Sequence, residues 1–181
     1  RQRQMCIRDR EGKQGLGTAY MAGFQTALDA GAQNIVEMDA DLSHPPEVLP
    51  GLIAELDEAD VAVASRYTPG GGVDPGWSWA RKQISYWGNV GIRLILGLEV
   101  KDATAGFKAF RRTTLERIEL DRLRLSGFGF QAEVAYRCEQ TGLKVVEHPY
   151  VFMERTAGKS KMSFGIVVEE FFRLYWLRIR R

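Results

Sequence analysis

The chain has 181 residues, of which 45% are hydrophobic and 27% are charged, and its formal net charge is +2. These values fit one globular domain with an ample core, and a charge so close to neutral argues against bulk nucleic-acid binding. The two cysteines, Cys6 and Cys138, lie far apart without metal-binding spacing, which favours free thiols in a reducing compartment.

The first ten residues do not look like a folded element, since they contain four arginines, one aspartate and no helical or strand period. We expect residues 1–10 to be a non-native or disordered leader. A glycine-rich loop over residues 12–17 precedes a predicted helix over residues 18–30, with a small packed face formed by Ala19, Ala22, Gly23 and Ala27. A Rossmann fingerprint would need Gly or Ala at position 20 and a preceding strand, so no dinucleotide site is expected here.

Two carboxylates follow a predicted buried strand. Asp39-Ala40-Asp41 closes the apolar run of residues 34–38, and the carboxyl ends of strands are where open α/β sheets bind ligands. Mg²⁺ or Mn²⁺ held by one or two carboxylates completes its shell with phosphate oxygens and water. The pattern therefore indicates a nucleotide-diphosphate site, although an Asp-x-Asp after a strand can also simply cap the next helix.

An arginine leaves the next predicted strand. Residues 46–58 are expected to form a structural amphipathic helix, and residues 61–65 a second apolar strand that runs directly into Arg66. A guanidinium at this strand end could reach the same diphosphate as Asp41, because its donors match phosphate oxygens. The alternative is a solvated turn arginine.

Arg81 and Lys82 open the next predicted helix, and Ser85 lies one turn beyond Arg81 on the same face. Its buried side is predicted to consist of Ile84, Trp87, Val90, Leu94 and Ile95. The strands and helices alternate along the chain without repeats, which favours a three-layer α/β domain.

Polar residues also stand in two later loops. Asp102 precedes a strand-like run over residues 107–110 and could cap a turn or contact a sugar hydroxyl. Gln131 and Glu133 begin a helix, where either could face a pocket or water.

The C-terminal segment is amphipathic. Charge interrupts it, like every other apolar stretch, well before the roughly 20 residues of a membrane-spanning helix. From residue 155 onward seven Lys or Arg and two Glu give a local balance of +5, which favours contact with anionic lipid headgroups. The helix expected over residues 163–181 could lie in a membrane interface, pack on the core, or do both.

Six segments together resemble family-two inverting glycosyltransferases, in particular the polyprenyl (dolichyl) phosphate mannose synthases: residues 12–20, 39–47, 65–72, 102–111, 127–133 and 155–162. The resemblance covers nearly everything after residue 10. It implies a GT-A fold, a three-layer α/β domain that uses Mg²⁺ or Mn²⁺ and moves mannose from GDP-mannose to a membrane-borne polyprenyl monophosphate.

The resemblance also implies roles for matching positions. The metal would be held by Asp39, Asp41 and Ser43, although many relatives have Gln where this chain has Ser43. Catalytic roles would fall to Asp41, Arg66, Arg81 and Arg155. The donor would contact Lys13, Gly15, Asp39, Ala40, Asp102, Gln131 and Glu133. The acceptor phosphate would meet Arg81, Ser85, Arg155, Ser160 and Lys161.

The family normally opens with a strand, a turn and a second strand whose acidic residue contacts the base or ribose, and this sequence does not contain them. Residues 11–162 are therefore expected to be an N-terminally truncated GT-A domain, peripheral at the cytoplasmic face of the membrane. Two alternatives stay open. One is a related transferase that uses UDP-glucose or another donor, and the other is a non-catalytic nucleotide-sugar binding or membrane-associating module.

Overall fold

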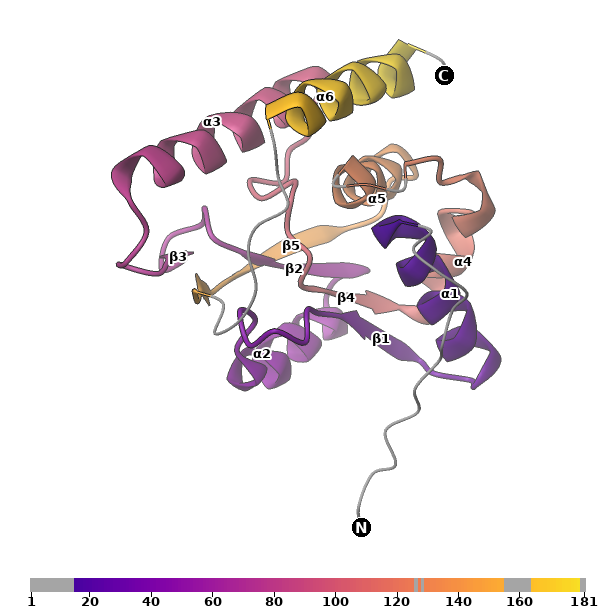
Figure 1. Ribbon diagram of the computed structural model, residues 1–181. Helices are drawn as coiled ribbons and strands as arrows, with labels where there is room; N and C mark the ends of the chain where they lie inside the picture. Colours follow the sequence, from indigo (N-terminus) through magenta and orange to yellow (C-terminus); the bar gives the residue numbers. More distant parts are fainter. Residues whose placement is uncertain (1–14, 126, 128, 155–163, 180–181) are drawn as a thin grey trace.

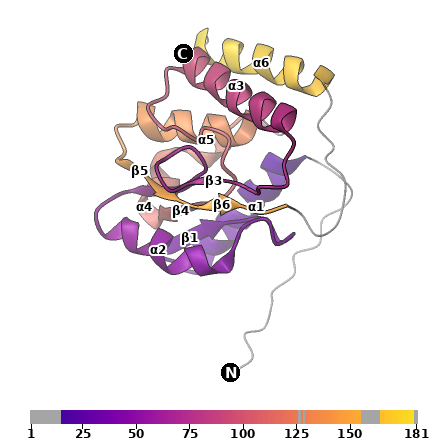
Figure 2. The same ribbon diagram turned by 90° about the vertical axis from the view of Figure 1, so that its left-hand side faces the viewer.

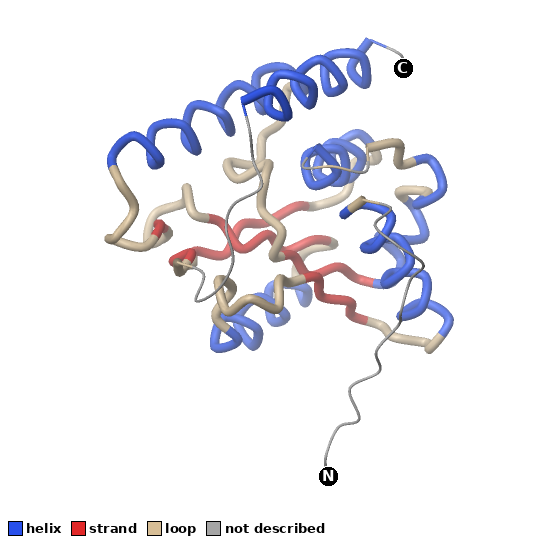
Figure 3. Tube along the Cα trace, in the orientation of Figure 1, coloured by secondary structure: helices blue, strands red, loops and turns tan. Residues whose placement is uncertain are grey.

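A computed structural model describes residues 15–125, 127, 129–154 and 164–179 of the chain. Its centre is a four-stranded sheet in the order β1-β4-β2-β5 (Figures 1 and 3). The strands are β1 (Asn34–Glu37), β2 (Val61–Ser65), β4 (Lys108–Arg111) and β5 (Val145–Pro149). β4 runs antiparallel to both β1 and β2, whereas β5 runs parallel to β2, so the sheet is mixed.

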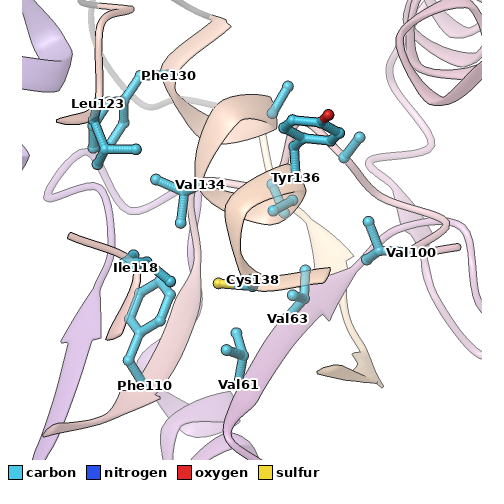
Figure 4. Packing of buried hydrophobic residues seen from close by; sticks show 14 of the residues in the cluster. Val61, Val63, Val100, Phe110, Ile118, Leu123, Phe130, Val134, Tyr136 and Cys138 are labelled. Atoms are coloured by element: carbon cyan, nitrogen blue, oxygen red, sulfur yellow. The ribbon is translucent and has the colours of Figure 1, made fainter. Parts of the chain in front are cut away.

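Both faces of the sheet are covered, which gives the predicted three layers. All five residues of β2 are buried, and the first four alternate between two separate hydrophobic clusters. Val61 and Val63 pack with α1 (Leu16–Asp29) and α5 (Gly129–Gln140), as Figure 4 shows for α5. Ala62 and Ala64 face α2 (Leu49–Ala54) on the opposite side. This continuous burial explains why the sequence of β2 reads as an uninterrupted apolar run.

The remaining elements are short, apart from two long helices. The short ones are the 3-10 turns η1 (Pro46–Val48), η2 (Glu55–Asp57) and η3 (Leu120–Arg122), the helix α4 (Arg112–Arg117), and β3 (Gly72–Val73) paired in parallel with β6 (Val151–Phe152). The long helices are α3 (Trp79–Leu96) and α6 (Phe164–Ile179), which lie side by side over α5 (Figures 1 and 2).

Two predicted helices exist but differ from expectation. α1 forms, and Ala27 packs against the core as predicted, but Ala19 and Gly23 are exposed and the buried residues of the helix are Gly17, Phe24 and Leu28. The large side chains decide which side of this helix faces the core, because they bury the most apolar area. The helix predicted over residues 46–58 is divided into η1, α2 and η2, although Leu52 and Leu56 are buried as its period requires.

The predicted buried side of α3 was only partly right: Ile95 packs against the core and Val90 is half-buried, but the other three residues are exposed. Ile84, Trp87 and Leu94 are 71%, 62% and 78% exposed. The buried residues of the helix are Asn89 and Leu96. Asn89 is fixed by hydrogen bonds to the loop before β4, since it donates to the Lys101 carbonyl and accepts from the Ala103 amide. α3 is therefore held by Asn89 and by its C-terminal apolar residues Ile92, Ile95 and Leu96, and its exposed apolar stripe points outward.

Exposed apolar residues also line α6. Phe172, Tyr175, Trp176 and Ile179 recur at helical spacing and are 52–65% exposed, while Leu174 is fully buried. Within the described residues, no helix has the length and apolar character needed to span a membrane. Cys138 is a free and buried thiol, and burial raises its pKa to about 12; Cys6 lies outside the described residues.

Candidate functional site

The first part of the site is the turn that follows β1. The Tyr20 hydroxyl donates to Asp39 Oδ1 at 3.1 Å, and the Asp39 amide donates to Nδ1 of the buried His44 at 2.9 Å. Burial, reinforced by the negative charges of Glu37, Asp39 and Asp41, raises the pKa of Tyr20. The phenol therefore stays protonated at neutral pH and keeps donating to Asp39.

Asp41 is held by its own turn. Its Oδ1 accepts from the Ser43 amide at 3.1 Å and from the Ser43 hydroxyl at 2.5 Å. Between them Leu42 has a φ of 65°, a left-handed conformation that residues other than glycine rarely adopt. Ser43 is fully buried. In this arrangement Ser43 orients Asp41, and its predicted role as a metal ligand stays a prediction.

The chemistry of this turn fits a divalent cation that arrives with a ligand. Asp39 and Asp41 offer hard carboxylate oxygens, which suit Mg²⁺ or Mn²⁺. Nowhere in the described part of the chain do three or more His, Cys, Asp or Glu form a group able to hold a metal ion. A cation here would need phosphate oxygens and water to complete its shell, so the donor set fits a metal–diphosphate complex and does not fit a closed structural site.

Arg66 and Asp102 form a buried ion pair. Arg66 Nε and Nη2 each donate to an Asp102 oxygen at 2.7 Å, and the Arg66 amide donates to Oδ2 at 3.0 Å. The side chains are 11% and 0% exposed. Burial raises the pKa of Asp102, but the Arg66 guanidinium outweighs it and brings the net pKa below the ordinary value. Asp102 therefore holds Arg66, and its fully buried side chain leaves no surface for a sugar hydroxyl, which was one of the two roles considered for it.

One extended segment connects the Asp41 turn to Arg66 and Arg81. It comprises β6 and the next two residues, 151–154. The Met153 amide donates to the Ser43 carbonyl at 3.2 Å. The Phe152 ring lies 5.8 Å from His44 and 5.9 Å from the Arg66 guanidinium. Side chains from three distant parts of the sequence are thus brought to the same end of the fold.

The segment ends at Arg81. Arg81 Nη1 donates to both oxygens of Glu154, at 2.8 and 2.7 Å, and its guanidinium lies 3.7 Å from the Trp77 ring centroid. One turn further along α3, the Ser85 hydroxyl lies 2.9 Å from the Tyr67 hydroxyl. Ser85 and Arg66 both line a cavity of about 240 Å³, together with Tyr67, Gly72, Val73, Trp77, Lys82, Gln83 and Tyr86.

The other predicted donor residues differ in accessibility. Glu133 is fully buried and accepts from the amides of Arg124 and Leu125, so it faces neither a pocket nor water. Gln131 is also buried, beside the site. Gly15 and Ala40 are exposed. The predicted residues Lys13, Arg155, Ser160 and Lys161 lie outside the described residues.

Sequence reasoning missed several residues that organise the site. Tyr20 and His44 hold Asp39, Glu147 accepts from the Asp102 amide at 3.0 Å, and Lys108 is almost fully buried. Only Lys108 gave a usable signal, because a lysine inside the apolar run of residues 107–110 is unexpected. The contacts of Tyr20 and Glu147 join distant segments, and the contact of His44 with Asp39 depends on the conformation of one turn, so none of them leaves a recognisable sequence pattern.

Comparison with known proteins places this site in context. The sequence profile of glycosyl transferase family 2 matches residues 2–119. The undecaprenyl-phosphate mannosyltransferase of Micrococcus luteus is 46% identical over 157 residues, which are 87% of this chain and 64% of that protein. The polyprenol monophosphomannose synthase of Mycolicibacterium smegmatis is 43% identical over 169 residues, 93% of this chain and 63% of that protein. The chain thus spans slightly less than two thirds of each relative.

A solved structure supports the architecture. The crystal structure of glucosyl-3-phosphoglycerate synthase from Mycobacterium tuberculosis, in complex with Mn²⁺, UDP-glucose and phosphoglyceric acid, superposes with a TM-score of 0.57. The match covers 95% of this chain and 56% of that chain at 16% sequence identity. At this identity the likeness concerns the fold alone.

Proposed function

Because the chain belongs to glycosyl transferase family 2 and has the GT-A fold that its sequence predicts, we propose that it is the catalytic part of a polyprenyl-phosphate mannosyltransferase. In this proposal GDP-mannose is the donor and a polyprenyl or dolichyl monophosphate is the acceptor. The observation that supports it most is the convergence of the Asp39–Asp41 turn, Arg66 and Arg81 along residues 151–154.

The donor diphosphate would bind between the two carboxylates and Arg66. Asp39 and Asp41 would hold Mg²⁺ or Mn²⁺, which, when bound, neutralises the charge that develops on the leaving GDP. Arg66 is already fixed by Asp102, so its position is set before substrate arrives. A preorganised cation stabilises developing negative charge without reorganisation during the reaction.

The acceptor phosphate would meet Arg81 and Ser85. Arg81 now donates from Nη1 to both oxygens of a carboxylate, Glu154, and a guanidinium that binds a carboxylate in this way can also bind phosphate oxygens. Ser85 supplies a hydroxyl one turn further on, at the cavity that Arg66 also lines. Arg155, Ser160 and Lys161 are proposed to complete this acceptor site.

The reaction needs alignment more than proton transfer. A phosphate oxygen of the acceptor forms the new bond to the anomeric carbon of mannose, and the bond from that carbon to the GDP oxygen breaks on the opposite face. The configuration inverts and GDP leaves with the electron pair. Because a phosphate monoester is already anionic near neutral pH, no strong general base is required, and positioning in line contributes most of the rate.

Product analysis tests this function against its alternatives. The protein is incubated with a short polyprenyl phosphate, Mn²⁺ and either GDP-mannose or UDP-glucose, and lipid products are detected by mass spectrometry. We expect a mannosylated lipid phosphate with GDP-mannose that disappears on chelation. Preference for UDP-glucose would identify a related transferase, and donor binding without any product would indicate a non-catalytic module.

The proposed position is peripheral at the cytoplasmic face of the membrane, and the outward apolar stripes of α3 and α6 support its contact with a membrane surface. Trp79, Trp87 and Leu94 of α3 are 62–78% exposed, and the neighbouring helix α6 exposes Tyr175 and Trp176. Trp and Tyr are enriched where protein meets lipid headgroups. The stripe of α3 lies on the same helix as Arg81 and Ser85, so contact with lipid would bring the acceptor phosphate to its site.

Charged substitutions on α3 test this surface. We expect Trp87→Glu and Leu94→Glu each to weaken binding to anionic lipid vesicles by about tenfold or more. Each replaces a large apolar side chain, which lipid would cover, by a negative charge. Vesicle co-sedimentation measures the effect. Ile53→Glu is the matched control, since Ile53 is 37% exposed on α2 across the sheet. Equal binding by all four proteins would exclude α3 as the membrane contact.

A further inference from the structure

Lys82, in the first turn of α3, is a second basic residue beside the candidate acceptor site. It lines the cavity of about 240 Å³, whereas its neighbour Arg81 is not among the lining residues in the described part of the chain. Arg81 instead donates to both oxygens of Glu154 and lies over the Trp77 ring. The Lys82 side chain forms no ion pair or hydrogen bond with the described residues. Of the two cations that open the helix, Lys82 is therefore the one available to a ligand in the cavity.

The carboxylate of Asp74 senses the charge of Lys82 but does not bind it. Asp74 Oδ1 accepts from the Gly76 amide at 2.8 Å, and Oδ2 accepts from the Glu154 amide at 3.1 Å. Lys82 interacts with this carboxylate only through its charge. Asp74 thus shapes the turn before α3 and leaves the ammonium of Lys82 free to donate.

The other polar groups of the cavity also suit an anion. Ser85 follows Lys82 by three residues on the same face of α3, and its hydroxyl lies 2.9 Å from the Tyr67 hydroxyl. Burial raises the pKa of Tyr67, so the phenol keeps its proton at neutral pH. When it donates to Ser85, the Ser85 hydrogen is available to a ligand oxygen. Arg66 adds a guanidinium whose charge Asp102 balances, and none of the described lining residues is acidic. Positive charge and hydrogen-bond donors of this kind match a phosphate.

The size and the apolar walls of the cavity indicate what carries the phosphate. Its volume is below the roughly 300–1,000 Å³ of sites that enclose drug-sized ligands, so a phosphate with its first carbons fits better than a nucleotide sugar. Val73, Trp77 and Tyr86 supply apolar surface to the lining. Tyr86 is 46% exposed, and its ring packs edge-on at 5.3 Å against Trp87 of the outward stripe of α3. The cavity therefore borders the surface that is proposed to meet lipid.

We propose that Lys82 binds the acceptor phosphate: its ammonium and the Ser85 hydroxyl hold a lipid-borne phosphate inside this cavity, while the first carbons of the lipid lie against the aromatic wall. This inference rests on the proposed function and adds to it a cation that lines the cavity itself. A free phosphate would use the same donors but would leave the apolar wall uncovered, so the lipid-borne form gains affinity from both.

Three variants test the role of the Lys82 charge. Lys82→Met removes the ammonium and keeps an unbranched side chain, and Lys82→Arg keeps the charge. Lys144→Met, at an exposed lysine outside α3, is the matched control. Calorimetry without donor measures the affinity of each protein for a short polyprenyl phosphate, for the corresponding alcohol and for inorganic phosphate. The kcat, the KM for each substrate and the Tm are measured as well.

We expect Lys82→Met to bind the polyprenyl phosphate at least about tenfold more weakly, as the loss of one charge-assisted hydrogen bond predicts. Its KM for this acceptor should rise by a similar factor. Its affinity for the alcohol and its KM for GDP-mannose should stay within about twofold of wild type, since neither ligand places a phosphate on Lys82. Lys82→Arg should restore most of the affinity, and Lys144→Met should match wild type. Wild type should prefer the polyprenyl phosphate to inorganic phosphate.

Other outcomes would overturn the inference. Wild-type affinity of Lys82→Met for the polyprenyl phosphate would exclude Lys82 from the acceptor site. Parallel losses of Tm, GDP-mannose affinity and acceptor affinity in both Lys82 variants would mean that the residue is only structural. Equal affinity of wild type for inorganic and polyprenyl phosphate would mean that the cavity holds a free phosphate. Binding of polyprenyl phosphate that depends on Lys82, without transfer of mannose, would contradict the proposed function alone.

Discussion

Replacing Asp41 by asparagine is expected to lower kcat/KM for mannosyl transfer by about 10²- to 10³-fold, the range seen when a group that stabilises developing charge is removed. Asparagine keeps the size of the side chain, and its carbonyl can still accept from Ser43, so the turn should persist. What is lost is the carboxylate charge that attracts the divalent cation. Steady-state rates at saturating Mn²⁺ measure the effect.

A control separates this effect from a change in folding. Asp57→Asn alters an exposed aspartate in η2 and should leave the rate unchanged. Thermal unfolding of both variants should stay close to wild type, because neither aspartate is buried in the core. If Asp41→Asn catalysed transfer at the wild-type rate, the Asp39–Asp41 turn would have no part in the mechanism.

Breaking the Arg66–Asp102 pair should produce the largest loss of stability. Asp102→Ala leaves a buried guanidinium without its counter-charge, and we expect the free energy of unfolding to fall by about 3–5 kcal/mol. Transfer should be lost as well, because Arg66 would no longer be fixed beside the diphosphate. Denaturant unfolding at neutral pH measures the stability.

The exposed pair Arg122–Glu119 provides the control for this variant. Its side chains are 63% and 48% exposed, so Arg122→Ala should cost less than about 1 kcal/mol. Equal effects of Asp102→Ala and Arg122→Ala would show that the buried pair adds nothing beyond a surface contact.

The Arg66–Asp102 pair also predicts how the stability of the protein changes at acid pH. The folded-state pKa of Asp102 lies below its ordinary value of 3.8, so its contribution is fully present above that pH and is lost as pH falls through the folded-state value. The stability difference between wild type and Asp102→Ala should therefore be constant from pH 7 to about 5 and shrink below about 4. A difference that grew in acid would contradict this assignment.

The sequence predicted the layered fold because its strongest signals were local. The apolar run of β2 could be read directly, since burial on both faces leaves uninterrupted hydrophobic residues, and the strand before Asp39 could be read from Ile35 and Val36. The antiparallel placement of β4 between β1 and β2 could not be read, because strand order depends on contacts between distant segments.

The error in α3 has a physical cause. Periodicity identifies an apolar stripe but does not say whether core or another surface covers it. In α3 the buried Asn89 bonds to the loop before β4 and fixes the rotation of the helix, so Ile84, Trp87 and Leu94 point outward. A stripe rich in tryptophan was the available hint that this face meets an interface.

The sequence predicted the site residues that lie at strand ends, but it did not predict the buried partners that hold them in place. Asp39, Asp41 and Arg66 could be proposed because each follows a recognisable strand. The pairing of Arg66 with Asp102, 36 residues further along, required the tertiary structure. The same holds for Lys108 and Gln131, which lie 23 residues apart and meet only through side chains.

Donor binding tests the central claim, that the Asp39–Asp41 turn and Arg66 form a metal-dependent diphosphate site. GDP-mannose is titrated into the protein by calorimetry with Mn²⁺ and again with a chelator. Binding that is strong with Mn²⁺ and at least tenfold weaker with chelator is the predicted result, because Asp39 and Asp41 would hold the metal and its charge would attract the donor diphosphate. Equal affinity under both conditions, or no binding with Mn²⁺, would contradict the account.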